Sequence, residues 1–487
     1  MIDTNAIRAK AADVAVTGQL TADYISESSA DKDLKNMGIV PGNIEDDEIP
    51  YKLKNGWEWV RMVDLGADTK NSFADGPFGS NLKREHYTTD KQVRIIQLSN
   101  VGELGWKDDN EKYTTFEHLE TIKRSEVEAG NIVIAKMMPA GRAIIVPDVS
   151  KAYVLSSDCV KFVPNDGLNA RYLCYAINSQ MFKKQVLQEV HGIGRERTSL
   201  SKLKSYLLPI PPVDEQTVIV EKIDSIYEML ERIDDLQEKY RNDLATLKAK
   251  IIDAGIRGKL TEQLPEDGDA ETLYAQIQEE KAKLIKEGKL RKTRGFDEIS
   301  EEVVPYDFPS RWSICYIDDI AFVTKLAGFE YTKNIADNIC KEGIPLFKGK
   351  NIQKGELILN FESFIPQSVS DELPRSKVNK KCLLTPYVGT IGNIALFDGS
   401  FEAHLGSNVG KIEILNPEVP CLLEEFLLYY LRSDIGYSEL TKHKKATAQD
   451  SISIDAIRNV IIAIPSLEEQ KRIIKVIDDT FSAIDGL

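Results

Sequence analysis

The sequence contains few of the residues from which metal and redox sites are usually built. Its 487 residues include six cysteines and five histidines. The cysteines are scattered singly and form no Cys-x-x-Cys pair, which argues against a zinc ribbon or a redox pair. The histidines lack the spacing of metal ligands. We therefore expect reduced thiols, a cytoplasmic location and no metal or cofactor held by this chain.

Long apolar runs are also missing. The longest, such as Val460–Ile464, have the length of a strand and fall far below the roughly 18 residues that span a bilayer. The first residues, Met1–Asn5, have neither the basic head nor the apolar stretch of a secretory signal. We expect no membrane association and, at this length, about two to four soluble domains.

Several catalytic motifs cannot be found. The segments Gly258-Lys259-Leu260 and Gly349-Lys350-Asn351 lack the hydroxyl and the upstream glycine of a phosphate-binding loop. There is no Gly-x-Ser-x-Gly and no His-Glu-x-x-His. Pro211-Pro212 is followed by Val213, not by the aromatic residue of an adenine methyltransferase turn. The sequence thus predicts a protein that is not an enzyme.

The net charge of −15 argues against nucleic-acid binding until its distribution is considered. Residues 57–212 contain 21 Lys and Arg against 19 Asp and Glu, and residues 305–465 contain 17 against 20. Most of the negative charge therefore lies in the connecting segments. Near-neutral globular parts can still present a basic face to a phosphate backbone.

The chain is a tandem repeat of about half its length. Trp57 in Gly-Trp-Glu-Trp-Val corresponds to Trp312 in Arg-Trp-Ser-Ile-Cys, 255 residues later. Each module also closes alike, with Ile-Pro-Pro-Val-Asp-Glu-Gln at 210–216 and Ile-Pro-Ser-Leu-Glu-Glu-Gln at 464–470. Order and spacing are kept between these points, which indicates duplication.

The repeat is also cyclic. Lys10, Asp13 and Gly-Gln-Leu-Thr at 18–21 match Lys250, Asp253 and Gly-Lys-Leu-Thr at 258–261. The N-terminal segment therefore resembles the end of the central segment, and residues 466–487 resemble its beginning. Residues 234–240, one heptad, have no counterpart.

Apolar residues at heptad spacing predict a long helix over 213–253, roughly 60 Å in length. We expect the two terminal segments to lie antiparallel against it, so that a pair of equivalent helices relates the two modules by an approximate twofold axis. The alternative is a homodimeric coiled coil. The residues expected to pack in this spacer are Ile7, Ile219, Ile223, Ile226, Leu230, Ile233, Leu244, Leu247, Ile473, Ile477 and Ile484.

Within each module, short β-rich runs such as Ile132–Ala135 and Ile394–Phe397 are separated by turn residues. A helix is predicted near the end of each module, over 170–190 and 422–440. The expected fold class is α+β: two globular domains with small mixed sheets, joined by a long antiparallel coiled-coil spacer. The expected segments are an N-terminal helix (1–20), a linker (21–50), domain 1 (51–212), the central helix (213–258), a charged linker (259–304), domain 2 (305–465) and a C-terminal helix (466–487).

Polar loops provide the candidate contacts to DNA. Arg can bridge guanine O6 and N7, Asn or Gln can pair with adenine, and Lys can hold phosphate. The alternative for each is an ordinary solvated loop. The candidates are Ser80, Asn81, Lys83, Arg84, Asn100, Arg142, Arg195, Arg197, Lys348, Lys350, Asn351, Lys380, Lys381, Asn393, Lys442, Lys444, Lys445 and Gln449.

These residues together resemble the DNA-specificity (S) subunits of Type I restriction–modification systems. The resemblance extends over essentially the whole chain and includes the cyclic repeat. Its motifs lie at 56–59 (Gly-Trp-Glu-Trp), 76–82 (Gly-Pro-Phe-Gly-Ser-Asn-Leu), 386–393 (Pro-Tyr-Val-Gly-Thr-Ile-Gly-Asn), 404–411 (His-Leu-Gly-Ser-Asn-Val-Gly-Lys), 211–216 and 465–470.

The resemblance implies a function. Each domain would be a target-recognition domain reading one half of a bipartite, asymmetric site in double-stranded DNA. The spacer would set the half-site distance and dock two modification (methyltransferase) subunits. S-adenosylmethionine, ATP and Mg would be bound by the modification and restriction (endonuclease/translocase) subunits. A different possibility is a non-catalytic coiled-coil scaffold whose modules dock proteins.

Overall fold

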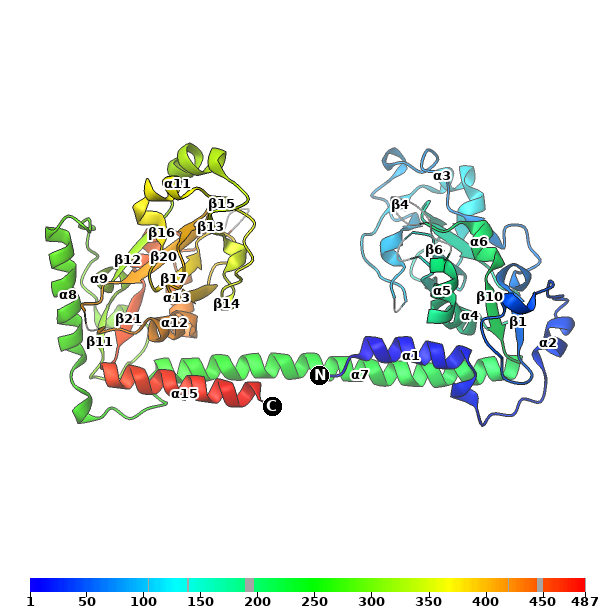
Figure 1. Cartoon of the computed structure of the whole chain (residues 1–487), viewed down its shortest axis with the longest axis horizontal. Coiled ribbons are helices and arrows are strands. Elements are labelled where there is room, and N and C mark those ends of the chain that lie inside the picture. Colours follow the sequence, from blue (N-terminus) through cyan, green and yellow to red (C-terminus); the bar gives the residue numbers. More distant parts are fainter. Residues whose placement is uncertain (104, 138–139, 189–196, 419, 445–449, 487) are drawn as a thin grey trace. The chain divides into compact units, whose positions relative to one another are not determined.

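The computed structural model describes residues 1–487 except 104, 138–139, 189–196, 419, 445–449 and 487 (Figure 1). The chain divides into two compact units, unit 1 (Met1–Lys239) and unit 2 (Tyr240–Leu487). Within the described residues, each unit has one two-stranded sheet and two larger sheets. The expected α+β class with small mixed sheets is confirmed.

In unit 1 the sheets have the strand orders β1-β10, β2-β9-β6-β7 and β4-β3-β8-β5. The third sheet is mixed, because β3 runs parallel to β8 and antiparallel to β4. The strands are β1 (Glu58–Arg61), β2 (Phe73–Asp75), β3 (Val93–Ile96), β4 (Tyr113–Thr114), β5 (Glu126–Val127), β6 (Ile132–Ala135), β7 (Ala143–Ile145), β8 (Tyr153–Leu155), β9 (Cys159–Phe162) and β10 (Leu207–Ile210).

Unit 2 repeats this plan with the orders β11-β21, β12-β20-β17-β18-β14 and β15-β13-β19-β16. Its strands are β11 (Ser313–Tyr316), β12 (Ala321–Lys325), β13 (Ile344–Phe347), β14 (Lys354–Gly355), β15 (Phe364–Ile365), β16 (Lys377–Val378), β17 (Cys382–Pro386), β18 (Ile394–Phe397), β19 (Ala403–Leu405), β20 (Val409–Ile414) and β21 (Ile461–Ile464).

Strand register is the same in the two units. In unit 1, Val160 of β9 lies opposite both Asp75 of β2 and Ile134 of β6. In unit 2, Gly410 of β20 lies opposite both Lys325 of β12 and Thr385 of β17. Asp75 and Lys325 therefore occupy equivalent positions. A one-residue slip would reverse the side chains relative to the core, so the shared register gives the two units a common backbone frame.

Helices cover these sheets in the same order in both units. The helix expected over 170–190 is two helices that meet at Ser179, and that over 422–440 divides at Ser433, whose side chain accepts the N–H of Gly436. The helices are α1 (Thr4–Val16), α2 (Ala30–Asn36), α3 (Phe116–Thr121), α4 (Ala170–Asn178), α5 (Gln180–Gln188), α6 (Leu200–Ser205), α7 (Val213–Ile256), α8 (Ala270–Lys286), α9 (Ile317–Ile320), α10 (Gly328–Glu330), α11 (Gln367–Asp371), α12 (Glu424–Arg432), α13 (Asp434–Thr441), α14 (Ile454–Arg458) and α15 (Leu467–Asp485).

Unit 1 contains an antiparallel helix pair formed by α1 and the first part of α7 (Figure 1). Thr4 Oγ1 donates to Asp234 Oδ1 at 2.5 Å, and Arg8 Nη2 donates to Asp234 Oδ2 at 2.8 Å. Further along, Tyr227 Oη donates to the Arg8 carbonyl at 3.3 Å. As residue numbers rise in α1 they fall in α7, as expected for the N-terminal segment.

Unit 2 forms its own pair from α15 and the last part of α7. Lys248 Nζ lies 2.5 Å from Asp485 Oδ1. Ile473 and Ile477 of α15 are fully buried in one core with Ile252 and Ile256 of α7. The antiparallel packing expected of the terminal segments is therefore present within each unit.

Most of the residues expected to pack in the spacer are at least partly buried. Ile219, Ile223, Leu230, Ile473, Ile477 and Ile484 are buried, and Ile226, Ile233 and Leu244 are half-buried. Ile7 and Leu247 are corrections, because they are 41% and 45% exposed. In α1 the buried face instead runs through Thr4, Arg8, Ala11 and Ala15 at helical spacing. This places Ile7 outside that face, which includes the alanines and Arg8, the ion-pair partner of Asp234 in α7.

A buried glutamate at the start of a helix joins distant segments in each unit. In unit 1, Glu215 accepts hydrogen bonds from Trp57 Nε1 at 2.9 Å, Lys54 Nζ at 2.7 Å and Thr21 Oγ1 at 2.6 Å. Glu215 is 1% exposed. The carboxylate therefore ties the N-terminal segment, the first strand region and α7 together.

Unit 2 has the equivalent network. Glu469 accepts from Trp312 Nε1 at 3.0 Å, from Gln263 Nε2 at 2.9 Å and from Thr261 Oγ1 at 3.2 Å. The lysine of unit 1 is thus replaced by a neutral amide. Both glutamates lie in a first helical turn, where the helix dipole stabilises negative charge.

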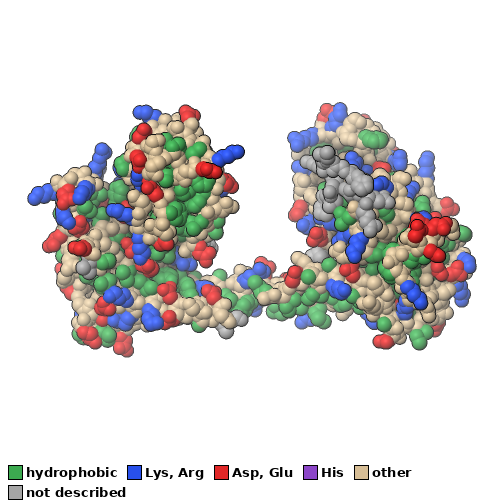
Figure 2. Space-filling model, in the orientation of Figure 1, with side chains coloured by type: hydrophobic (Ala, Val, Ile, Leu, Met, Phe, Trp, Pro, Cys, Tyr) green, Lys and Arg blue, Asp and Glu red, His purple; other side chains and the backbone are tan. Residues whose placement is uncertain are grey.

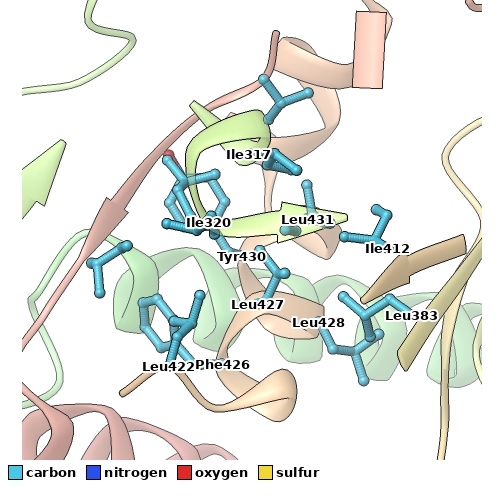
Figure 3. Packing of buried hydrophobic residues seen from close by; sticks show 14 of the residues in the cluster. Ile317, Ile320, Leu383, Ile412, Leu422, Phe426, Leu427, Leu428, Tyr430 and Leu431 are labelled. Carbon is cyan, nitrogen blue, oxygen red and sulfur yellow. The ribbon is translucent and has the colours of Figure 1, made fainter. Parts of the chain in front are cut away.

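The main core of unit 2 packs α12 against the sheet and α9 (Figure 3). Leu427 and Tyr430 of α12, Leu383 of β17, Ile412 of β20 and Ile320 of α9 are all fully buried. The same element of unit 1, α4, has buried Tyr172, Leu173 and Ile177 among its residues. In each unit an amphipathic helix, α4 or α12, therefore packs on the sheet.

The segment before module 2 packs on unit 2 through α8. Ala270 and Ile277 are fully buried. Gln278 Nε2 donates to the Asp319 carbonyl and Lys281 Nζ donates to the Asp318 carbonyl, each at 2.6 Å. Part of the expected charged linker (259–304) is thus a helix that belongs to the unit's fold.

The buried carboxylates predict different stability losses. Glu215→Ala leaves the indole N–H of Trp57 without its acceptor and removes the counter-ion of the Lys54 ammonium, which keeps only the carbonyls of Thr21 and Tyr24. This should cost about 3 kcal/mol, because a charge is left without its ion-pair partner. Glu469→Ala leaves only neutral donors and should cost about 2 kcal/mol. Denaturant unfolding followed by tryptophan fluorescence measures both.

Glu221→Ala, at an exposed position of α7, is the matched control and should change stability by no more than about 0.5 kcal/mol. A loss for Glu469→Ala as large as that for Glu215→Ala would contradict this explanation.

Candidate nucleic-acid interface

Unit 1 contains a groove of about 810 Å³ at the end of its first large sheet. One side is the loop after β2, which includes Asp75, Phe78 and Asn81. The other sides come from the region of Arg124 and from the segment that begins at Arg197. Segments far apart in the sequence are thus brought together where β2 and β6 end.

The floor of the groove holds a buried lysine. Lys136 follows β6, is 5% exposed, and its Nζ lies 2.5 Å from Asp75 Oδ1. The Asp75 side chain is 38% exposed. An ammonium with only partial hydration needs a counter-ion, which Asp75 supplies, while the carboxylate itself remains accessible from the groove.

Cationic and aromatic side chains surround this pair. Arg124 and Arg197 are exposed, and Arg197 Nη2 donates to the Ser157 carbonyl at 3.3 Å. Phe78 is 83% exposed on the loop. The loop approaches the next turn so closely that a Cβ on Gly76 would lie 1.7 Å from the Ser156 carbonyl oxygen, which requires glycine there.

Unit 2 builds the same place with different side chains. Lys325 ends β12 and its Nζ lies 4.5 Å from the ring centroid of Tyr387, which follows β17. Burial raises the pKa of Tyr387, so its hydroxyl stays neutral. Phe329 is 72% exposed on α10, the short helix after β12. An exposed aromatic side chain therefore follows this strand in both units.

Backbone hydrogen bonds confirm that the two places are equivalent. The N–H of Lys136 donates to the Asp158 carbonyl at 2.8 Å, and the N–H of Tyr387 donates to the Asn408 carbonyl at 3.0 Å. The carbonyl of Lys136 accepts the N–H of Thr198, which lies just before α6, at 2.9 Å. The carbonyl of Tyr387 accepts the N–H of Ile452, which lies just before α14, also at 2.9 Å. The frame is shared, and the side chains on it differ.

Some candidates from the sequence lie in or near the groove of unit 1. Asn81 and Arg197 line it. Ser80, Lys83 and Arg84 are exposed on the continuation of the same loop. Arg142 is half-buried.

Asn100 and Asn351 are corrections, because they are 0% and 1% exposed. Asn100 Nδ2 donates to the carbonyls of Lys107 and Asp109 at 2.9 and 2.8 Å, and its Oδ1 accepts the N–H of Gln97. Asn351 makes the equivalent three bonds in unit 2. Their amides hold a turn and are not available to a base.

The candidate lysines of unit 2 are paired with neighbours of the same unit. Lys348 Nζ donates to Ser363 Oγ at 2.7 Å, and Lys350 pairs with Glu362. Lys442 pairs with Glu439 at 2.6 Å and Lys444 with Asp450 at 2.5 Å. Asn393 Nδ2 donates to the Ile352 carbonyl at 3.1 Å. Asp450 raises the pKa of Lys444 through their hydrogen bond.

Lys380 and Lys381 lie at the other end of the sheet from Tyr387. They precede β17, whose last residue is followed by Tyr387. At about 3.3 Å per strand residue, Lys381 and Tyr387 are roughly 20 Å apart. Lys381 pairs with Glu425 at 2.7 Å. Three further candidates, Arg195, Lys445 and Gln449, fall outside the described residues.

Sequence reasoning missed Lys136, which lines the groove of unit 1, and Lys325 and Tyr387, which lie at the equivalent place in unit 2. A signal was present, because Lys136 directly follows the predicted strand Ile132–Ala135. Its meeting with Asp75 depends on the order β2-β9-β6, in which both strands flank β9. That order cannot be read from a local pattern.

Charge on the visible faces is mixed in both units (Figure 2). Among the described residues, no helix is long and apolar enough to cross a membrane. The same residues contain no group of three or more His, Cys, Asp or Glu side chains that could hold a metal ion. Burial raises the pKa of the Cys159 thiol to about 12, which makes it a poor nucleophile or ligand.

A family model described as "Type I restriction modification DNA specificity domain" matches residues 85–239 and 309–485, more than half of the chain. The chain belongs to this family. Each matched range covers most of the repeated module in one unit. Membership confirms the resemblance found in the sequence and groups this family member with the DNA-specificity components, not the catalytic ones, of Type I restriction–modification systems.

Curated relatives agree with this membership. The chain is 22% identical over 329 residues to the Type I restriction enzyme EcoBI specificity subunit of Escherichia coli, covering 68% of this chain and 62% of that protein. It is 22% identical over 513 aligned residues to the EcoEI specificity subunit of Escherichia coli, covering 91% and 81%. The chain therefore spans about three fifths of the EcoBI subunit's length.

One solved structure has a similar fold. It is a chain from work described as "Structural basis underlying complex assembly and conformational transition of the type I R-M system", with a TM-score of 0.53 and 16% identity. The match covers 90% of this chain and 93% of that one. At this identity it shows the fold alone.

The buried asparagines of this family member generate a stability prediction. Asn351→Ala and Asn100→Ala should each cost about 2 kcal/mol, because two carbonyls and one N–H lose their partner. Thermal or denaturant unfolding measures the loss. Ser80→Ala on the exposed loop is the control and should change stability by about 0.5 kcal/mol or less. Wild-type stability in both asparagine variants would contradict the turn-holding role.

Proposed function

We propose that the chain is the sequence-specific DNA-recognition subunit of a Type I restriction–modification complex, and that each unit reads one half of a bipartite, asymmetric site. The observation that carries the proposal is the pair of equivalent strand-end regions with unlike side chains, Asp75 and Lys136 in one and Lys325 and Tyr387 in the other. One backbone frame with two sets of side chains suits two different half-sites.

The groove of unit 1 supports contact with a duplex. It combines exposed guanidinium groups, Arg124 and Arg197, with an exposed aromatic, Phe78. Guanidinium groups bind phosphate and guanine edges, and aromatic tips contact bases. The acidic residues of the network at Glu215 are buried and would not oppose the approach of DNA.

The continuous helix α7 supports a role in spacing and assembly. Its 44 residues correspond to roughly 66 Å of helix. Met229 and Leu236 are 60% and 64% exposed, and Tyr240 and Leu247 are 44% and 45% exposed. Apolar side chains exposed on a helix are suitable for binding other proteins. We propose that two methyltransferase subunits bind there.

The partners would supply the chemistry. Methyltransferase subunits would bind S-adenosylmethionine, and restriction subunits would use ATP and Mg. The proposed role also implies a cytoplasmic location. A scaffold that binds only proteins is the competing function, since the exposed apolar residues of α7 would suit it equally.

Salt dependence of DNA binding separates these two functions. The assembled complex should bind its site with an affinity that falls steeply as salt rises, because phosphate contacts release counter-ions. Removing Arg124 and Arg197 together should weaken binding and lower the slope of log affinity against log salt by about one per lost contact. Fluorescence anisotropy over a salt series provides the measurement.

Lys32→Ala with Lys35→Ala is the matched control, because it removes two exposed positive charges from α2 of the same unit. This variant should keep the wild-type slope. A wild-type complex that binds no DNA at low salt would instead favour the scaffold.

The spacing role predicts the effect of a heptad insertion after Lys239. Contacts of α1 with α7 extend to Gln237, and those of α15 begin by Lys248, so the insertion leaves both helix pairs intact. Seven residues add about 10 Å of helix, or about three base pairs of duplex. Mapping of methylated adenines should show a longer gap between unchanged half-sites.

A matched variant of wild-type length replaces the exposed Lys239, Arg241 and Asp243 by alanine and should leave the gap unchanged. Half-sites at the wild-type distance in the insertion variant, in a complex that still methylates DNA, would rule out the spacing role.

A further inference from the structure

The end of the central strands in each unit carries two side chains whose chemistry is reversed between the units. In unit 1, Asp75 ends β2 and its partner Lys136 follows β6. In unit 2 the equivalent of Asp75 is Lys325, and the equivalent of Lys136 is Tyr387. The ion pair of Asp75 with Lys136 is thus replaced by the cation–π contact of Lys325 with Tyr387.

Other polar residues of the same frame do not change in this way. Lys161 Nζ donates to the Glu126 carbonyl at 2.8 Å, and the equivalent Lys411 Nζ donates to the Lys377 carbonyl at 2.8 Å. Burial lowers the pKa of Lys161, as expected for a structural lysine. Asn100 and Asn351 are likewise equivalent in type and bonding. The pair at 75 and 136 keeps neither its residue types nor its ion pair in unit 2.

We propose that Asp75 with Lys136, and Lys325 with Tyr387, are specificity-determining pairs, each contacting a base pair in the half-site read by its own unit. The inference rests on the proposed function. It adds which residues of each unit contact a base pair and which class of base they select.

In unit 1 the selecting group is the carboxylate. Ionised Asp75 has only acceptor sites, one of which Lys136 uses, and the side chain is 38% exposed in the groove. Lys136 positions the carboxylate and offsets its repulsion from phosphate. An acceptor in a major groove selects bases with an exocyclic amino group, so unit 1 prefers cytosine or adenine at this position.

In unit 2 the selecting group is the ammonium. Lys325 Nζ has three donors and no acceptor, and the ring of Tyr387 at 4.5 Å orients it without using those donors in an ion pair. Acceptors on the major-groove edge are presented by guanine O6 and N7 and by thymine O4. Unit 2 therefore prefers guanine or thymine at the equivalent position.

The test exchanges the pair within the full chain in its assembled complex. Lys325→Asp with Tyr387→Lys gives unit 2 the pair of unit 1. Bound duplexes selected from a randomised library should change from guanine or thymine to cytosine or adenine at one position of one half-site, by ~10-fold or more in preference. The other half-site and the gap should stay as in the wild type.

The matched control is Lys292→Asp, which reverses a charge at an exposed position of the same unit outside β12 and β17. It should lower binding to all duplexes by a similar factor and leave the selected bases unchanged. Thermal unfolding of each variant in parallel checks the fold. If the exchanged pair unfolds unit 2, Lys325→Gln replaces it and should reduce the preference at the same position by ~10-fold.

The outcomes separate the two levels of the argument. A folded variant that binds the library and selects wild-type bases at every position overturns the specificity role of the pairs but leaves DNA recognition standing. A wild-type complex that selects no sequence from the library overturns the proposed function itself.

Discussion

The buried carboxylate at the start of a helix is the interaction on which each unit depends. Glu215 of α7 accepts hydrogen bonds from the N-terminal segment and from the first strand region, and Glu469 of α15 accepts them from the segment after α7 and from Trp312. A buried acceptor of this kind is costly unless all its donors are in place. The N-terminal segment therefore completes unit 1 in the same way as the segment after α7 completes unit 2, in agreement with the cyclic repeat.

In each unit, the residues that hold the backbone are different from the exposed residues at the strand ends. Buried polar groups such as Asn100 and Lys161 bond to backbone carbonyls, so they stabilise turns and strands whatever the exposed side chains are. Residues at strand ends, such as Asp75 and Lys325, contribute little to the core and can differ between units at small cost in stability. Two units of one design can thus present different chemistry to a partner.

Individual helices and strands could be predicted from the sequence, whereas contacts between residues of different elements could not. The bounds of β6 and β18 and the start of α7 were foreseen, because β-branched runs and heptads are local patterns. The breaks at Ser179 and Ser433 were missed, since apolar periodicity continues through them. Asn100 resembled a base-reading residue and proved to hold a turn, and Lys136 was overlooked because strand order brings it to Asp75.

Closure of a unit by a distant segment is tested most directly by comparing residues 1–239 with residues 21–239 in denaturant, using the fluorescence of Trp57 and its neighbours. The first should unfold in one cooperative transition, because its helix pair and the Glu215 network are complete. Removal of α1 exposes the facing surface of α7 and removes the contacts of Thr4 and Arg8 with Asp234, so the second should lose about 3 kcal/mol or more. Identical transition midpoints for the two would contradict the account.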